Sequence, residues 1–181
     1  MQRQVSAALL FGAAVCFAPS ADAQQVNAGA GENKDAGILP QPITTNGIPA
    51  LFAHDGGRIF NTAGQPVTVR TTNNAGALAN GGIINLDGGG TINVTNTTAG
   101  GLQALYANGG GSTITATSAN VITTGDRARG AWAFQGGQIT LNGGSIQTSG
   151  ANSPGLIAAA VGGVTSHITS SADISTMGAG S

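Results

Sequence analysis

The stretch Ala131-Trp-Ala-Phe-Gln-Gly-Gly137 decides the fold, because its pattern of a short apolar run followed by two glycines recurs along the chain. Four further copies occupy residues 51–57, 77–82, 105–110 and 158–163. The first glycines of the five pairs lie at positions 56, 81, 109, 136 and 162, so they are 25, 28, 27 and 26 residues apart. A near-constant period in this range indicates a solenoid, in which every repeat is one structural unit.

Each repeat contains three short stretches that favour β-strands. The apolar run before the glycines is the first. The second stretch follows the glycines, at residues 58–60, 83–86, 113–115, 138–141 and 166–169. The third follows a further turn, at residues 67–71, 91–95, 121–124, 145–148 and 173–176. One repeat therefore predicts three strands and three corners.

The composition fits strands and turns better than helices. The chain of 181 residues contains 31 glycines and 6 prolines, and only 7% of its residues are charged. So much glycine and proline would suggest disorder in a chain without a period, but the regular repeat favours an ordered fold. No segment has apolar residues at helical spacing, whereas apolar and polar residues alternate, as at Ile92 and Val94.

We therefore predict an all-β fold, a right-handed parallel β-helix of about five coils over residues 47–181. Its short strands bury their apolar side chains by pairing with the coils before and after, so that like residues stack inside. One expected stack contains Ile59, Ile84 or Leu86, Ile114, Ile139 and Ile168. A second contains Val69, Val94 or Ile92, Val121 or Ile122, Ile146 and Ile174. A left-handed β-helix would show a hexapeptide repeat instead.

The glycine pairs are expected at tight corners, because glycine adopts a positive φ without a steric penalty. Polar residues precede four of the five pairs and are expected to form a ladder along one edge of the solenoid. The five positions of this expected ladder are Asp55, Asn80, Asn108, Gln135 and Val161.

The first 23 residues have the pattern of a secretory signal peptide. Arg3 precedes an apolar segment at residues 5–18, and Ala21-Asp-Ala23 is a cleavage signal before Gln24. The apolar segment is short for a membrane span, so an uncleaved anchor is the less favoured alternative. Cys16, the only cysteine, would leave with the signal peptide, and the exported chain would carry no disulfide.

Residues 24–46 show neither sustained alternation nor a helical period, and they include Pro40 and Pro42. We expect a flexible N-terminal segment here, or an irregular cap near Ile38, Leu39 and Ile43.

The stretches at residues 101–111 and 133–155 resemble passenger domains of bacterial autotransporters of the pertactin type. The resemblance covers the signal peptide and residues 47–181. It implies a right-handed β-helix in the periplasm, at the cell surface or outside the cell, associated with the outer membrane if a barrel partner exists. Its partners would be host surface or extracellular-matrix molecules or glycans. Since no C-terminal β-barrel pattern precedes Ser181, we expect the N-terminal part of a passenger, either a fragment or a truncated frame.

The sequence shows no cluster of residues for catalysis. A β-helical polysaccharide lyase or hydrolase needs converging carboxylates. The candidate acids fall at four different places in the repeat: Asp55, Asp87, Asp126 and Asp173. His54 and His167 also lie in different parts of the coil, so we expect no catalytic residue, metal or cofactor. A structural or adhesive role is the leading hypothesis, and a carbohydrate-active enzyme or a truncated, non-functional remnant are the alternatives.

Three features are candidates for surface contacts. Arg127 and Arg129 form the one basic spot, which is a contact for anionic glycans, a protease-sensitive loop or, as the favoured alternative, an ordinary solvated corner. The net charge of −1 and the scattered basic residues argue against nucleic acid. The last coil would leave an uncovered interior, so we expect self-association through the open coil end. Aromatic residues recur in the first strand of the repeats, where they bind sugars or stack in the interior or at a corner: Phe52, Tyr106, Trp132 and Phe134.

Overall fold

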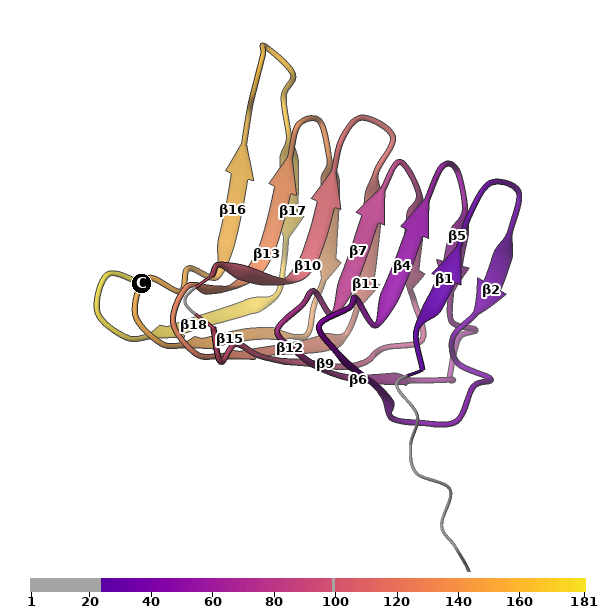
Figure 1. The fold of residues 1–181 in the computed structure, drawn as a ribbon, viewed down its shortest axis with the longest axis horizontal. Helices are drawn as coiled ribbons and strands as arrows, with labels where there is room; N and C mark the ends of the chain where they lie inside the picture. The colour runs from indigo at the N-terminus through magenta and orange to yellow at the C-terminus, as the bar shows by residue number, and fades with distance from the viewer. Residues whose placement is uncertain (1–23, 99) are drawn as a thin grey trace, which may run out of the picture.

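The chain folds into a parallel β-helix of about six turns, described for residues 24–98 and 100–181 by a computed structural model. Every coil contributes one strand to each of three sheets, and the described residues contain no helix. The coils lie side by side, with the first at the right and the last at the left of Figure 1. The predicted all-β solenoid is therefore confirmed.

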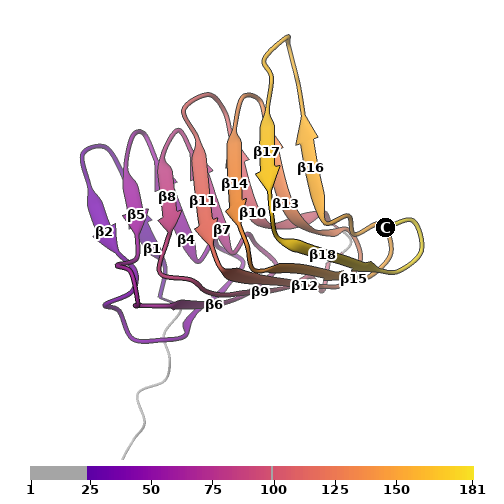
Figure 2. The same cartoon turned by 180° about the vertical axis from the view of Figure 1, so that it is seen from behind.

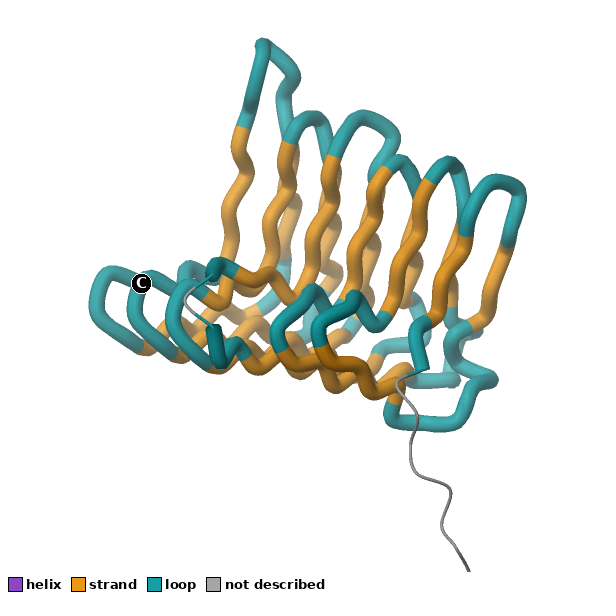
Figure 3. Tube along the Cα trace, in the orientation of Figure 1, coloured by secondary structure: helices purple, strands orange, loops and turns teal. Residues whose placement is uncertain are grey.

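The three sheets, named A, B and C, form the sides of a prism. Sheet A lies nearer the viewer in Figure 1 and sheet B in Figure 2, and sheet C runs below them. Loops between sheets A and B line up along the upper edge in Figure 3. Sheet A contains β1 (Val26–Ala28), β4 (Leu51–His54), β7 (Ala77–Asn80), β10 (Leu102–Asn108), β13 (Ala128–Phe134) and β16 (Leu156–Ala159). Sheet B contains β2 (Asn33–Asp35), β5 (Arg58–Phe60), β8 (Ile83–Leu86), β11 (Thr113–Thr117), β14 (Gln138–Asn142) and β17 (His167–Ser170). Sheet C contains β3 (Ile43–Asn46), β6 (Val67–Thr72), β9 (Gly90–Thr95), β12 (Ala119–Thr124), β15 (Ser145–Ser149) and β18 (Asp173–Met177).

The strand register confirms the two predicted interior stacks. In sheet B the stacked residues are Ile59, Ile84, Ile114, Ile139 and Ile168. In sheet C they are Ile43, Val69, Ile92, Val121, Ile146 and Ile174. All members are buried except the last of each stack, since Ile168 is half-buried and Ile174 is 46% exposed. Parallel pairing thus buries apolar side chains that no single coil could cover.

The structure differs from the expectation at residues 24–46, which form an additional first coil. Its strands β1, β2 and β3 pair with β4, β5 and β6. Val26, Ala28 and Ile43 are at most 3% exposed, and Leu39 packs against the core. The chain therefore makes about six turns where the repeat count predicts five.

The corner between sheets A and B shows why two glycines recur. Gly56 has a φ of 83°, in the left-handed region that favours glycine. A Cβ added to Gly57 would lie 2.2 Å from the backbone oxygen of Ala28 in the preceding coil. The first glycine therefore permits the turn, and the second permits the coils to stack closely.

The predicted polar ladder has a different register in the structure. His54 rather than Asp55 pairs with Asn80, because Asp55 is an extra residue with a φ of 52°. Gln135 is likewise an extra residue, with a φ of 49°. The pair of Asn80 and Asn108 is found as expected, and Asn108 Nδ2 donates a hydrogen bond to Asn80 Oδ1 at 3.2 Å.

The expected signal peptide, with Cys16 and the cleavage residues Ala21 and Ala23, lies outside the described residues. Gln24, the expected first residue after cleavage, is described, and its backbone N–H donates to Thr44 O at 3.1 Å. Gln24 therefore joins the first coil.

Candidate functional site

The outer face of sheet A carries a row of large side chains, one from each coil. Successive side chains of a strand point to opposite faces, so each large outward residue is followed along its strand by a small inward one. The inward alanines of β4, β7, β10 and β13 are 0% exposed: Ala53, Ala79, Ala107 and Ala133. The outward residues in register are Asn27, Phe52, Leu78, Tyr106, Trp132 and Ile157. We call Phe52, Leu78, Tyr106 and Trp132 the aromatic row, in which Leu78 is the one residue without a ring. All four side chains are half-buried.

One pair of rings in the aromatic row stacks across two coils, and two further ring contacts lie within single strands. The Tyr106 and Trp132 rings are stacked, with centroids 5.2 Å apart and an interplanar angle of 18°. The Phe134 ring lies 5.1 Å from Trp132 at 50°, and Phe52 stacks on His54 at 4.7 Å. Such offset and tilted arrangements are favourable for aromatic pairs. The rings thus form a supported outer surface, and the expected alternative of an interior stack does not apply to them.

Arg129 lies on this surface and adds a positive charge to it. Its Cζ is 4.7 Å from the centroid of the Trp132 ring, a cation–π arrangement. Its Nη1 occupies the space beside Gly101, where an added Cβ would lie only 2.5 Å from that atom. Among the described residues, Arg129 has no carboxylate within ion-pair distance and no hydrogen-bond acceptor. The guanidinium therefore packs on Trp132 beside Gly101, and no carboxylate of the described residues pairs with its charge.

Three polar atoms on this face are buried and lack hydrogen-bond partners. They are Arg129 Nε, Trp132 Nε1 and Asn108 Oδ1, the complete set found among the described residues. Native structures leave few buried polar atoms unpaired, so each such atom calls for a physical explanation. That all three belong to sheet A, on neighbouring strands β10 and β13, marks this face as the candidate site.

The pKa of Tyr106 is affected by its partial burial in the aromatic row and by Arg129. Desolvation raises the pKa of its hydroxyl above the ordinary value, and the nearby charge of Arg129 acts in the opposite direction. Burial disfavours the phenolate, whereas an adjacent cation favours it. Tyr106, Trp132 and Arg129 therefore act on one another electrostatically.

The two arginines that the sequence places together have different positions. Arg127 precedes β13, has a φ of 57°, and its backbone N–H donates to Ala151 O at 2.8 Å. Arg129 lies within β13 and packs on Trp132. The structure therefore associates Arg129 with the aromatic row and leaves Arg127 in the turn.

The candidate acids and histidines remain distributed over the prism. Asp55 follows β4 and lies 2.7 Å from His54 Nδ1, whereas His167 begins β17. Asp87 accepts a hydrogen bond from Thr117, and Asp126 accepts one from the Ala151 backbone. Asp173 begins β18. Within the described residues, no three histidine, cysteine, aspartate or glutamate side chains are placed to hold a metal ion.

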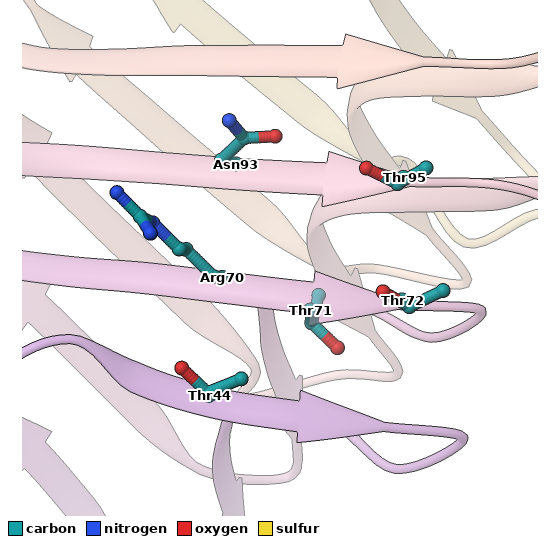
Figure 4. Close-up of a pocket in the computed structure, with 6 residues that line it drawn as sticks. All are labelled: Thr44, Arg70, Thr71, Thr72, Asn93 and Thr95. Carbon is teal, nitrogen blue, oxygen red and sulfur yellow. The ribbon is translucent and has the colours of Figure 1, made fainter. Parts of the chain in front are cut away.

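A second surface feature is a polar hollow on the outer face of sheet C. In Figure 4, Arg70 extends from β6 toward Asn93 on β9, among threonines of β3, β6 and β9. The hollow is lined by Thr44, Arg70, Thr71, Thr72, Asn93 and Thr95. None of these residues has a buried unpaired polar atom, so the hollow offers fewer unmet hydrogen-bonding groups than sheet A.

Sequence reasoning identified the aromatic residues and Arg129 but not the roles of Gly101 and Asn108. The alternation of alanine with large side chains in β4 to β13 is the signal that places the rings outside. No comparable signal marks Gly101, because its contact with Arg129 depends on the conformation of the Arg129 side chain across the paired strands β10 and β13.

The fold defines a parallel β-solenoid. No family model, curated protein or solved structure matches this chain. The described residues also include no helix with the length and hydropathy needed to cross a bilayer.

Proposed function

We propose that the chain is an exported passenger segment of the autotransporter type, displayed at the cell surface or released, with a structural and adhesive role. The observation that carries the adhesive role is the aromatic row with Arg129 on the outer face of sheet A. Aromatic and arginine side chains supply most of the energy of binding surfaces. The stacked coils beneath hold these side chains on regular strands, which favours precise binding.

The sequence of the first 23 residues supports export, because it combines a charged start, an apolar segment and a small-residue cleavage site. The proposed location is the periplasm, the cell surface or the medium, in association with the outer membrane if a barrel partner exists. The proposed partners are host surface or extracellular-matrix molecules, including glycans.

The dispersed acids support a role without catalysis. Glycoside hydrolysis uses two carboxyl groups that flank one bond. Here Asp87 and Asp126 each accept a hydrogen bond from another coil, and they follow strands of different sheets. These contacts support structural roles for both carboxylates.

Adhesion is tested by binding of the purified protein to immobilised matrix proteins and glycans. The protein is compared with Trp132→Ala and with Phe60→Ala, a matched change of an aromatic residue that is 36% exposed on sheet B. We expect Trp132→Ala to reduce binding to background and Phe60→Ala to retain it. Equal binding by both variants, or the release of cleaved glycan products, would contradict the proposal.

Export is tested by expressing the full chain in a Gram-negative host and determining the N-terminus of the fractionated product by mass spectrometry. We expect a product that begins at Gln24 and leaves the cytoplasm. A cytoplasmic product that retains Met1 would contradict export.

A further inference from the structure

We infer that the ligand of the sheet A face is an acidic saccharide whose carboxylate or sulfate group binds Arg129 beside the Tyr106–Trp132 stack. This inference rests on the proposed adhesive function and specifies the ligand class. It is carried by the position of Arg129 and by the unpaired donors around it.

The charge of Arg129 favours an anionic ligand. The nearest titratable group with a described electrostatic effect is Tyr106, which is neutral at pH 7. No ion pair of the described residues includes Arg129. A guanidinium presents several N–H groups in a plane, a geometry suited to the two oxygens of a carboxylate or sulfate. The site therefore has a cation that no described anion pairs with.

Two unpaired hydrogen-bond donors favour the same kind of ligand as the positive charge does. Arg129 Nε and Trp132 Nε1 are both hydrogen-bond donors, and both lie without an acceptor at the same contact. Leaving a buried donor unpaired is unfavourable, so a ligand that supplies acceptor oxygens gains from pairing it. An anion bound to the guanidinium would therefore supply acceptor oxygens at the contact where both donors lie.

The surroundings of Arg129 favour a sugar over another anion. The half-buried Tyr106, Trp132 and Phe134 rings provide apolar surface for the C–H groups of a sugar, and the Asn80–Asn108 amide pair lies two residues beyond Leu78 and Tyr106 along β7 and β10. Asn108 Oδ1 is an unpaired acceptor that suits a sugar hydroxyl. Because the same positions repeat at each coil, about 4.8 Å apart, a chain of sugars aligned with the helix axis meets these groups in succession.

The experiment uses fluorescence, because Trp132 is the only tryptophan in the chain. The purified protein is titrated with an oligosaccharide of alternating glucuronic acid and N-acetylglucosamine, and with its methyl ester, which lacks the charge. A sulfated neutral galactan oligosaccharide and oligo-glutamate are the two further probes. We expect Trp132 emission to change with an acidic saccharide and at least tenfold weaker binding of the ester.

The outcomes separate the inference from the proposed function. Binding by the glucuronate probe alone identifies a carboxylate ligand, and binding by the galactan probe alone identifies a sulfate ligand. Equal binding of acid and ester overturns the anionic inference and leaves the adhesive function standing. Tighter binding of oligo-glutamate than of either sugar overturns the saccharide assignment. No binding by any probe, together with retained adhesion to matrix proteins, overturns the inference alone, and loss of that adhesion as well overturns both.

A matched pair of arginine variants locates the anion. Arg129→Gln is expected to weaken binding of the acidic probe about tenfold and to leave binding of the ester unchanged. Arg70→Gln, which removes an exposed arginine from sheet C, is the control and is expected to bind as the unmodified protein does. Calorimetry gives the affinities independently of any change in Trp132 emission. Equal losses in both variants would overturn the assignment to Arg129.

Discussion

The outer faces of sheets A and C belong to the same coils, yet they carry different side chains. Sheet A presents stacked rings with Arg129, whereas the hollow on sheet C is lined by threonine, asparagine and Arg70. Buried polar atoms without partners occur only on sheet A among the described residues. The comparison shows that the interior stacks determine the fold, while each outer face is free to acquire its own binding chemistry.

The largest expected effect comes from the interior that both faces share. Leu105 and Leu78 lie on the neighbouring strands β10 and β7 of sheet A. Leu105 points inward and is 0% exposed, whereas Leu78 points outward and is half-buried. We expect Leu105→Ala to lower the free energy of unfolding by about 3 kcal/mol, because it leaves a cavity. Leu78→Ala is expected to lower it by less than about 1.5 kcal/mol. Denaturant unfolding measures both, and equal losses would contradict the assignment of the two faces.

The second prediction concerns the last strand of sheet C. Ile174 continues a buried stack but is 46% exposed, and Met177 is 59% exposed. We expect this apolar surface of β18 (Asp173–Met177) to cause concentration-dependent self-association of the 181-residue chain. Sedimentation is expected to show less association for Ile174→Ser than for Ile38→Ser, a control at a 74% exposed isoleucine in the first coil. A monomer at all concentrations would contradict this prediction.

A smaller effect is expected from displacing Arg129 without removing its charge. A Cβ at Gly101 would lie 2.5 Å from Arg129 Nη1, whereas at Gly100 the nearest atom would be Thr98 Oγ1 at 3.6 Å. We expect Gly101→Ala to weaken binding of the acidic oligosaccharide about threefold, with Gly100→Ala as the unaffected control. Calorimetric titration of both variants checks this, and a loss confined to Gly100→Ala would contradict the Arg129 contact.

The smallest expected effect is electrostatic. Burial raises the pKa of Tyr106, and the charge of Arg129 counteracts that rise, so Arg129→Gln is expected to raise the pKa further. Because the folded-state pKa is raised, the associated stability is present below the unfolded pKa of about 10 and is lost as pH rises through the folded pKa. Tyr106 is the only tyrosine, so its ultraviolet absorbance gives the titration directly. An unchanged or lowered pKa in Arg129→Gln, with Arg70→Gln as control, would contradict the proximity of the two side chains.

The repeat period was enough to predict the coils and their interior stacks, because each depends on local alternation and on like residues recurring. The first coil was not predicted, since β2 is the polar segment Asn33–Asp35 and no glycine pair follows β1. Its burial comes from pairing with the second coil, which is distant in sequence.

The candidate site was predicted in part. The residue types of the aromatic row and Arg129 were recognised, but the ladder register was shifted because Asp55 and Gln135 are extra residues at the corners. Extra residues of this kind depend on left-handed backbone conformations, which non-glycine residues adopt infrequently. The contact of Arg129 with Gly101 depends on the pairing of β10 with β13 and has no sequence signature.

The most direct test of the central claim is the ¹H–¹⁵N correlation spectrum of the protein during titration with the acidic oligosaccharide. The chain has one indole N–H, that of Trp132, and its Nε1 has no acceptor among the residues that the structure describes. The account predicts that this peak shifts together with the backbone peaks of Tyr106 and Arg129. An unmoved indole peak, with shifts confined to the sheet C strands around Arg70, would contradict the assignment of the binding face to sheet A.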